Sequence, residues 1–105
     1  MRIITKYTNL DSTPAIETYI NEKVGALAKF LRPFEVNNEI NARIEVGRTT
    51  NHHNKGLVYR AEINLDLPGE VLRAEHEDWD VRIAIDQAKD KLQREVVKYK
   101  ERLNG

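Results

Sequence analysis

The C-terminal quarter of the chain carries the feature that most constrains its fold, a long apolar stripe with the period of an α-helix. Between residues 81 and 103 the apolar side chains recur at steps of three and four residues. These are Val81, Ile85, Ala88, Leu92, Val96, Tyr99 and Leu103. This spacing places them on one face of a helix. Because a helix with a single apolar face is stable only against another apolar surface, the rest of the chain must supply that surface.

Three upstream segments have the alternating pattern of β-strands that are buried on one face. Residues 40–46 alternate apolar and polar side chains, and residues 57–67 form the longest alternation in the chain. Pro68-Gly69 then predicts a tight turn into a returning strand around residues 72–74. We therefore expect an antiparallel meander. Its second face is expected to be solvated, because it carries charged side chains, namely Arg43, Glu45, Arg60, Glu62 and Arg73.

The N-terminal part predicts a strand followed by a helix. Residues 2–7 are short, β-branched and aromatic, as is typical of a strand. Thr13 suits a helix N-cap, and Pro14 suits the first helical position, where its missing N–H costs nothing. Apolar residues then recur at helical spacing until Pro33, which is expected to end the helix. They are Ile16, Ile20, Val24, Leu27 and Leu31.

The predicted order is β-α-β-β-β-α, which defines an α+β fold. The first helix must cross between two parallel strands, and the later strands form the meander, so the sheet has four strands and is mixed. The economical arrangement packs both helices on one face of this sheet. A chain of 105 residues is the size of one domain, and we expect residues 1–105 to form a single one.

Several functional classes find no support in the composition. The chain has no cysteine, so disulfides, thiol nucleophiles and cysteine zinc sites are excluded, and Ser12 is the only serine. No nucleotide-binding or hydrolase motif occurs, so we expect no enzyme, no cofactor and no small-molecule substrate. His52, His53 and His76 lack metal-binding spacing, and we expect no metal site; His52 and His53 are interpreted as solvated loop residues. No apolar run is long enough for a signal peptide or membrane span, which favours a cytoplasmic protein without a membrane partner.

The distribution of charge is more informative than its sum, which is zero. Residues 91–105 hold five basic and two acidic side chains, so positive charge is concentrated at the C-terminal end. On a helical wheel, Lys91, Arg94, Lys98 and Arg102 share one flank, where neighbours repel one another. One interpretation is a row of phosphate contacts. The other is a solvated helix face, because lysine and arginine are good helix formers and favour a helix C-terminus.

Two smaller sets of charged residues allow similar alternatives. Lys23 and Lys29 lie off the apolar stripe of the first helix and either extend the basic surface or are simply solvated. The acidic cluster before the last helix is interpreted as capping it, because a helix N-terminus favours negative charge. Its members are Glu75, Glu77, Asp78 and Asp80. Trp79 beside them is expected to be a packing lid.

The run AEHEDWDVRIAIDQAKDKLQREVVKYKERL resembles the ribosome hibernation-promoting factor family, which includes the ribosome-associated inhibitor and was once described as sigma-54 modulation proteins. Members of that family have an acidic entry, then D-M-Y-A-A-I-D, then D-K-L-x-R-Q-L-x-K-x-K. The matching positions are Asp80, Ala84, Ile85, Asp86, Asp90, Lys91, Leu92, Arg94, Lys98 and Lys100. The resemblance extends more weakly over the whole chain.

The resemblance implies a fold like the double-stranded-RNA-binding domain. It also implies binding to the 30S ribosomal subunit and its 16S rRNA, in 70S or 100S particles, across the path of messenger RNA and tRNA. Such binding inhibits translation and protects idle ribosomes under starvation or in stationary phase. By motif, Lys91, Arg94, Lys98 and Lys100 would contact ribosomal RNA, and Lys23 matches a basic position of the first helix.

This sequence departs from the family pattern at two places. Val81-Arg82 replaces Met-Tyr, and Ala26 replaces a lysine for which Lys29 is a possible substitute. Long family members carry a further C-terminal domain, so the chain corresponds to a short form or to the N-terminal domain of a long form. The alternative function is a protein-interaction module that modulates a transcription factor.

Overall fold

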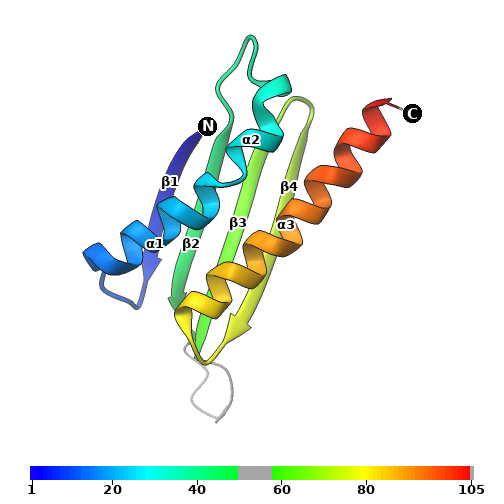
Figure 1. The fold of residues 1–105 in the computed structure, drawn as a ribbon. Helices are drawn as coiled ribbons and strands as arrows, with labels where there is room; N and C mark the ends of the chain where they lie inside the picture. The colour runs from blue at the N-terminus through cyan, green and yellow to red at the C-terminus, as the bar shows by residue number, and fades with distance from the viewer. Residues whose placement is uncertain (50–57, 105) are drawn as a thin grey trace.

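The computed structural model describes residues 1–49 and 58–104 and confirms the predicted order of elements (Figure 1). Its strands are β1 (Arg2–Thr8), β2 (Asn41–Arg48), β3 (Tyr59–Leu67) and β4 (Glu70–Asp78). Its helices are α1 (Pro14–Gly25), α2 (Ala28–Leu31), a 3-10 turn (Arg32–Phe34) and α3 (Val81–Asn104). Leu57, expected at the start of the third strand, lies outside the described residues, as do His52 and His53.

The four strands form one mixed sheet in the order β1-β2-β3-β4. β1 pairs in parallel with β2, so the chain between them crosses over the sheet, whereas β2, β3 and β4 are successively antiparallel. Ile44 lies opposite Ile63, which lies opposite Ala74, so the apolar faces of the strands coincide. β1 and β4 are consequently the two edges of the sheet.

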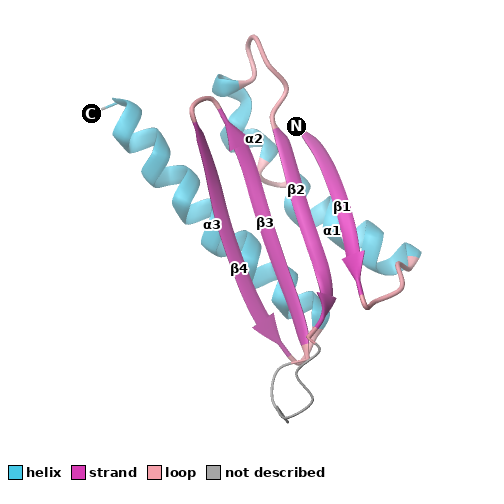
Figure 2. Cartoon of the chain, turned by 180° about the vertical axis from the view of Figure 1, so that it is seen from behind, coloured by secondary structure: helices cyan, strands magenta, loops and turns pink. Residues whose placement is uncertain are grey.

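All helices lie on one face of the sheet, and the other face is open (Figures 1 and 2). α3 packs across β3 and β4, and α1 packs against β1 and against α3. The core between the layers includes fully buried side chains from both, among them Ile20, Leu27, Ile44, Ile63, Leu65, Ile85 and Leu92. Burial of each such side chain contributes about 1.5–3 kcal/mol relative to exposure, so this seam holds the two layers together.

The first helix is shorter than the apolar spacing predicts, because α1 ends at Gly25. After Gly25, the backbone N–H of Leu27 donates to the carbonyl of Val24, and that of Phe30 donates to the carbonyl of Leu27. Each bond spans three residues, as in a 3-10 turn, and not four as in an α-helix. Glycine is a poor helix former, and the break redirects the chain while Leu27 and Leu31 remain fully buried. The predicted buried stripe is therefore right, but the continuous helix up to Pro33 is wrong.

The ends of the other elements follow the predicted local chemistry. The Thr13 hydroxyl accepts from the backbone N–H of Ile16 at 3.2 Å and caps α1. Between β3 and β4, Pro68 and Gly69 form a two-residue turn, in which Gly69 has a φ of 76° that a side chain would disfavour. The turn and the cap therefore lie where the sequence predicts them.

The acidic cluster caps α3 with only part of its members. Asp80 Oδ1 accepts from the backbone N–H of Arg82 at 2.8 Å, and Asp78 Oδ2 accepts from that of Asp80 at 2.9 Å. Of the cluster, Glu75, Glu77 and Asp78 belong to β4, and Glu75 pairs with arginines on the open face of the sheet. The capping interpretation is therefore wrong for Glu75. Trp79 is 59% exposed, so it is not a packing lid.

Two glycines predict opposite responses to alanine. A Cβ at Gly47 would collide with the backbone oxygen of Thr8 on the paired strand, whereas a Cβ at Gly25 meets nothing within 4 Å. We expect Gly47→Ala to lower the free energy of unfolding by about 1–3 kcal/mol. Gly25→Ala is expected to raise it by up to about 1 kcal/mol, because alanine favours the helical backbone. Urea denaturation measures both, and equal effects would contradict the assigned β1–β2 contact.

Candidate nucleic-acid interface

The predicted basic ridge (Lys91, Arg94, Lys98 and Arg102) lies on the flank of α3 that faces β4. The buried stripe, which packs against β3 and β4, lies next to this flank and sets its orientation. Three of its cations line a hollow of about 280 Å³ between the helix and the edge strand, which we call the edge groove. The groove is lined by Arg73, Ala74, Lys91, Arg94, Glu95 and Lys98. Four of these six residues are basic and one is acidic, so the groove favours an anion.

The members of the ridge differ in how firmly the protein itself holds them. Lys91 Nζ donates to the backbone oxygen of Glu75 at 3.1 Å and lies 3.1 Å from Nδ1 of His76. Because an ammonium group only donates, this second contact requires Nδ1 to be the accepting nitrogen. One terminal nitrogen of Arg102 donates to both carboxylate oxygens of Glu70, at 2.8 and 2.9 Å. Arg102, which only the helical wheel supported, is thus neutralised by a neighbour.

Arg94 and Lys98 make weaker contacts, both within their own helix. Arg94 Nε lies 3.4 Å from the carbonyl oxygen of Asp90, and Lys98 Nζ lies 3.5 Å from Glu95 Oε1. The Lys98 side chain is 65% exposed. Exposed pairs of this kind contribute less than about 1 kcal/mol, so an incoming anion displaces them readily. Arg94 and Lys98 are therefore the most available cations of the ridge.

Lys100 lies on the other flank of α3 and joins Lys29 rather than the ridge. Its Nζ lies 5.7 Å from the ring centre of Phe30 and 6.0 Å from that of Phe34. Lys29 Nζ lies 5.2 Å from the same Phe30 ring. The structure thus brings two predicted site residues, from different helices, together around one aromatic side chain.

Lys23 lies at the seam between α1 and α3. Its Nζ is 3.9 Å from Asp86 Oδ1, a buried oxygen that accepts no hydrogen bond from the described part of the chain. The other oxygen of Asp86 accepts from the hydroxyl of Tyr19 at 2.6 Å. Arg82 and Lys23 both lie against the Tyr19 ring, at 5.6 and 5.5 Å from its centre. Asp86, which matches the last position of the D-M-Y-A-A-I-D block, therefore has a structural role in joining the two helices.

Sequence reasoning missed three basic residues that the fold places near these sets. Arg82 and Lys89 occupy the same flank of α3 as Lys100, and a helical wheel would have grouped them by their spacing. The side chain of Lys89 is only 18% exposed and pairs with Asp90. Arg73 lines the edge groove from β4, which no pattern within one element could indicate, because the groove forms between a strand and a helix.

The open face of the sheet has a different character, because its charges neutralise one another. The alternation of the strands places five basic and five acidic side chains there. They are Arg2, Lys6, Arg43, Arg60 and Arg73, and Glu45, Glu62, Asp66, Glu75 and Glu77. Arg43 donates two hydrogen bonds to the carboxylate of Asp66, at 2.8 and 3.0 Å. We expect this face to attract polyanions less strongly than the helical layer does.

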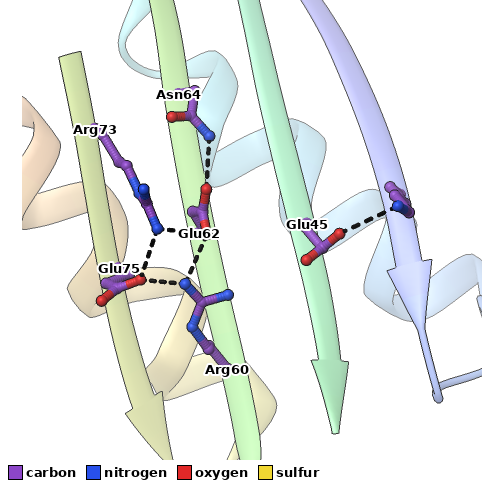
Figure 3. Close-up of polar contacts among 7 residues, drawn as sticks. Glu45, Arg60, Glu62, Asn64, Arg73 and Glu75 are labelled. Carbon is purple, nitrogen blue, oxygen red and sulfur yellow. Dashed lines mark hydrogen bonds and ion pairs between the residues drawn. The ribbon is translucent and has the colours of Figure 1, made fainter. Parts of the chain in front are cut away.

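On β3 and the edge strand β4, that face carries an ion-pair network of Arg60, Glu62, Asn64, Arg73 and Glu75 (Figure 3). A hydrogen bond from Asn64 and the two arginines hold the pKa of Glu62 below its ordinary value, although burial opposes this shift. Hydrogen bonding to Arg60 likewise lowers the pKa of Glu75. The folded protein thus favours the ionised form of both carboxyl groups.

Among residues 1–49 and 58–104, no group of three or more histidine, aspartate or glutamate side chains is arranged to hold a metal ion. The described helices include none that is long and apolar enough to cross a membrane.

The lowered pKa values of Glu62 and Glu75 predict a loss of stability in acid. Their contribution is present above the ordinary glutamate pKa of 4.5 and is lost as the pH falls through the lowered values in the folded state. The double variant E62Q/E75Q should therefore be less stable than the wild type at neutral pH and lose less stability on acidification. Urea denaturation at about pH 7 and pH 3.5 measures this difference. E101Q, which alters an exposed carboxylate on α3, should keep the wild-type acid response.

Removing the Tyr19 hydroxyl should loosen the seam between α1 and α3. Burial, followed by the hydrogen bond to Asp86, raises the pKa of Tyr19 to about 12. Tyr19→Phe should lower the free energy of unfolding by about 1–3 kcal/mol, because it removes the only hydrogen bond described for the Asp86 side chain. This contribution should be present below about pH 10 and disappear towards pH 12, since the folded state binds the phenolic proton more tightly. An equal loss in the matched variant Tyr59→Phe would contradict the assignment.

Comparison with known proteins agrees with the resemblance seen in the sequence. The model of the family described as Sigma 54 modulation protein / S30EA ribosomal protein matches residues 3–104. The chain is 36% identical over 96 residues to the ribosome hibernation promotion factor of Staphylococcus aureus (strain COL), covering 91% of this chain and 46% of that protein. It is 33% identical over 98 residues to the factor of the same name from Lactococcus lactis subsp. cremoris (strain MG1363), covering 91% and 48%. The chain thus spans about half the length of these curated relatives.

Two solved structures have the same fold. The crystal structure of the Thermus thermophilus Protein Y N-terminal domain superimposes with a TM-score of 0.68 at 34% identity, covering 94% of this chain and 99% of that one. A ribosomal subunit interface protein from Coxiella burnetii superimposes with a TM-score of 0.75 at 24% identity, covering 96% and 99%, which supports the fold alone. The match over nearly the whole sequence shows that the chain belongs to the Sigma 54 modulation protein / S30EA ribosomal protein family.

Proposed function

We propose that this chain is a ribosome-binding hibernation factor that contacts the 16S rRNA of the 30S subunit through its helical layer. The observation that carries the proposal is the division of charge between the two faces of the molecule. Cations of α1, α2 and α3 gather on the helical layer, whereas the charges of the open sheet face pair with one another. The names of the curated relatives supply the partner, the ribosome.

Binding would rest on phosphate contacts from two basic areas. Lys91, Arg94 and Lys98 form the first area at the edge groove, and Arg94 offers a planar group that bonds two phosphate oxygens at once. Lys29 and Lys100 form the second area, on the other flank of α3 from the edge groove. Lys23 extends this area along α1. Arg102 would contribute less, because Glu70 already neutralises it. Two areas on either side of one helix suit a partner that is recognised by its shape, as folded RNA is.

Inhibition would follow from occlusion rather than chemistry. A domain held by ribosomal RNA in the channel of messenger RNA and tRNA excludes both ligands by its volume. The same contacts would hold an idle ribosome in 70S or 100S particles and protect it. This mechanism requires no cofactor and no catalytic group.

Reversing the charge of the ridge should abolish binding without unfolding the protein. We expect the variant K91E/R94E/K98E to remain at the top of a sucrose gradient that carries the wild type down with 30S subunits at about 50 mM salt. Wild-type binding should weaken steeply between about 50 and 200 mM salt, because each phosphate contact releases counterions.

The matched control R2E/K6E/R43E changes the net charge equally on the open face and should still sediment with the subunits. Circular dichroism establishes that both variants are folded. Undiminished binding by folded K91E/R94E/K98E would refute the proposed interface. Binding that tolerates salt and survives nuclease treatment would instead indicate the protein-interaction module.

A further inference from the structure

Arg73 belongs to two neighbouring features that compete for it. Arg73 lines the edge groove together with Lys91, Arg94 and Lys98. Its guanidinium group, however, is turned to the open face, where it contacts Glu62 and Glu75 (Figure 3). Because β4 is the edge of the sheet, Arg73 lies where the open face meets the groove.

Within the ion-pair network, Arg73 is the more loosely held of the two arginines. Its terminal nitrogen lies 3.1 Å from Glu62 Oε2 and 3.3 Å from Glu75 Oε2. Arg60 contacts the same two oxygens at shorter distances, including 2.6 Å to Glu62. The Arg73 side chain is also 57% exposed, against 29% for Arg60. If Arg73 left, both carboxylates would therefore still be paired with Arg60.

The α3 side of the groove carries cations that would attract a phosphate group, and Arg73 could leave Glu62 and Glu75 to bind it. Arg94 and Lys98 project from α3 with weak contacts of their own, and Glu95 is the one acidic residue of the lining. A phosphate group seated between strand and helix would meet cations on the helix side and a long, exchangeable guanidinium on the strand side. Guanidinium groups bind phosphate oxygens in pairs and exchange out of exposed ion pairs readily.

We propose that Arg73 is a further phosphate ligand of the edge groove and that Glu75 is its built-in competitor. A phosphodiester of the RNA backbone draws the guanidinium from Glu75 and Glu62, so the carboxylate of Glu75 lowers the affinity of the site. This inference rests on the proposed RNA-binding function, and it adds a strand residue to an interface otherwise built on helices.

Four single variants and one double variant test it with two probes, purified 30S subunits and a 20-base-pair RNA duplex. R73Q should weaken binding of both probes roughly three- to tenfold and reduce the salt slope by about one contact. R43Q removes a cation from the same sheet face, away from the groove, and should change binding less than about twofold. E75Q should strengthen binding, and D66N, which removes an equal charge beside Arg43, should not.

The decisive result is the coupling between Arg73 and Glu75. In the double variant R73Q/E75Q, the increase in affinity caused by E75Q should vanish, because the guanidinium group that E75Q releases is absent. A gain that persists without Arg73, or equal effects of R73Q and R43Q, would overturn the inference while leaving RNA binding intact. If the wild type binds the duplex but not 30S subunits, the ribosomal function fails and the duplex series alone decides the role of Arg73. If it binds neither probe, both proposals are wrong.

Discussion

The packing of α3 against β3 and β4 is the constraint on which the rest of the structure depends. The apolar stripe, with Leu92 at its centre, is buried from Ile85 to Tyr99 and fixes the rotation of the helix about its axis. Leu103, which the spacing also placed on the stripe, is 58% exposed, because it lies near the end of the helix. Every other position of α3 is thereby assigned a direction. Lys91 and Arg94 face the edge strand, Lys100 faces α2, and Ile83 and Val97 face solvent. The chemistry of the surface is thus a consequence of the core.

Most of the fold could be predicted from the sequence because the spacing of the apolar residues differs clearly between the strands and the helices. The alternation in β3 and the stripe of α3 each express one rule of local geometry, and the turn at Pro68-Gly69 joins them as expected. The end of α1 at Gly25 was missed because the apolar spacing continues through it. Buried contacts continue across the break, and only the backbone hydrogen bonds reveal it.

The candidate site was predictable only as far as one helix determines it. A wheel groups Lys91, Arg94 and Lys98, but it cannot indicate that Glu70 neutralises Arg102 or that Lys100 meets an aromatic ring of α2. Those contacts join segments far apart in the chain. The same limit explains Glu75, whose position near the start of α3 suggested capping, although strand pairing aligns it with Glu62 on the neighbouring strand.

The cations around Phe30 illustrate how a protein can order a charge without cancelling it. A carboxylate partner fixes a lysine but removes its field, as Glu70 does for Arg102. An aromatic ring attracts an ammonium through its quadrupole and carries no net charge. Lys29 and Lys100 therefore give up side-chain freedom before any ligand arrives while their full positive potential still reaches into solvent. For the RNA contact proposed above, less conformational entropy would therefore remain to be lost on binding at this part of the surface.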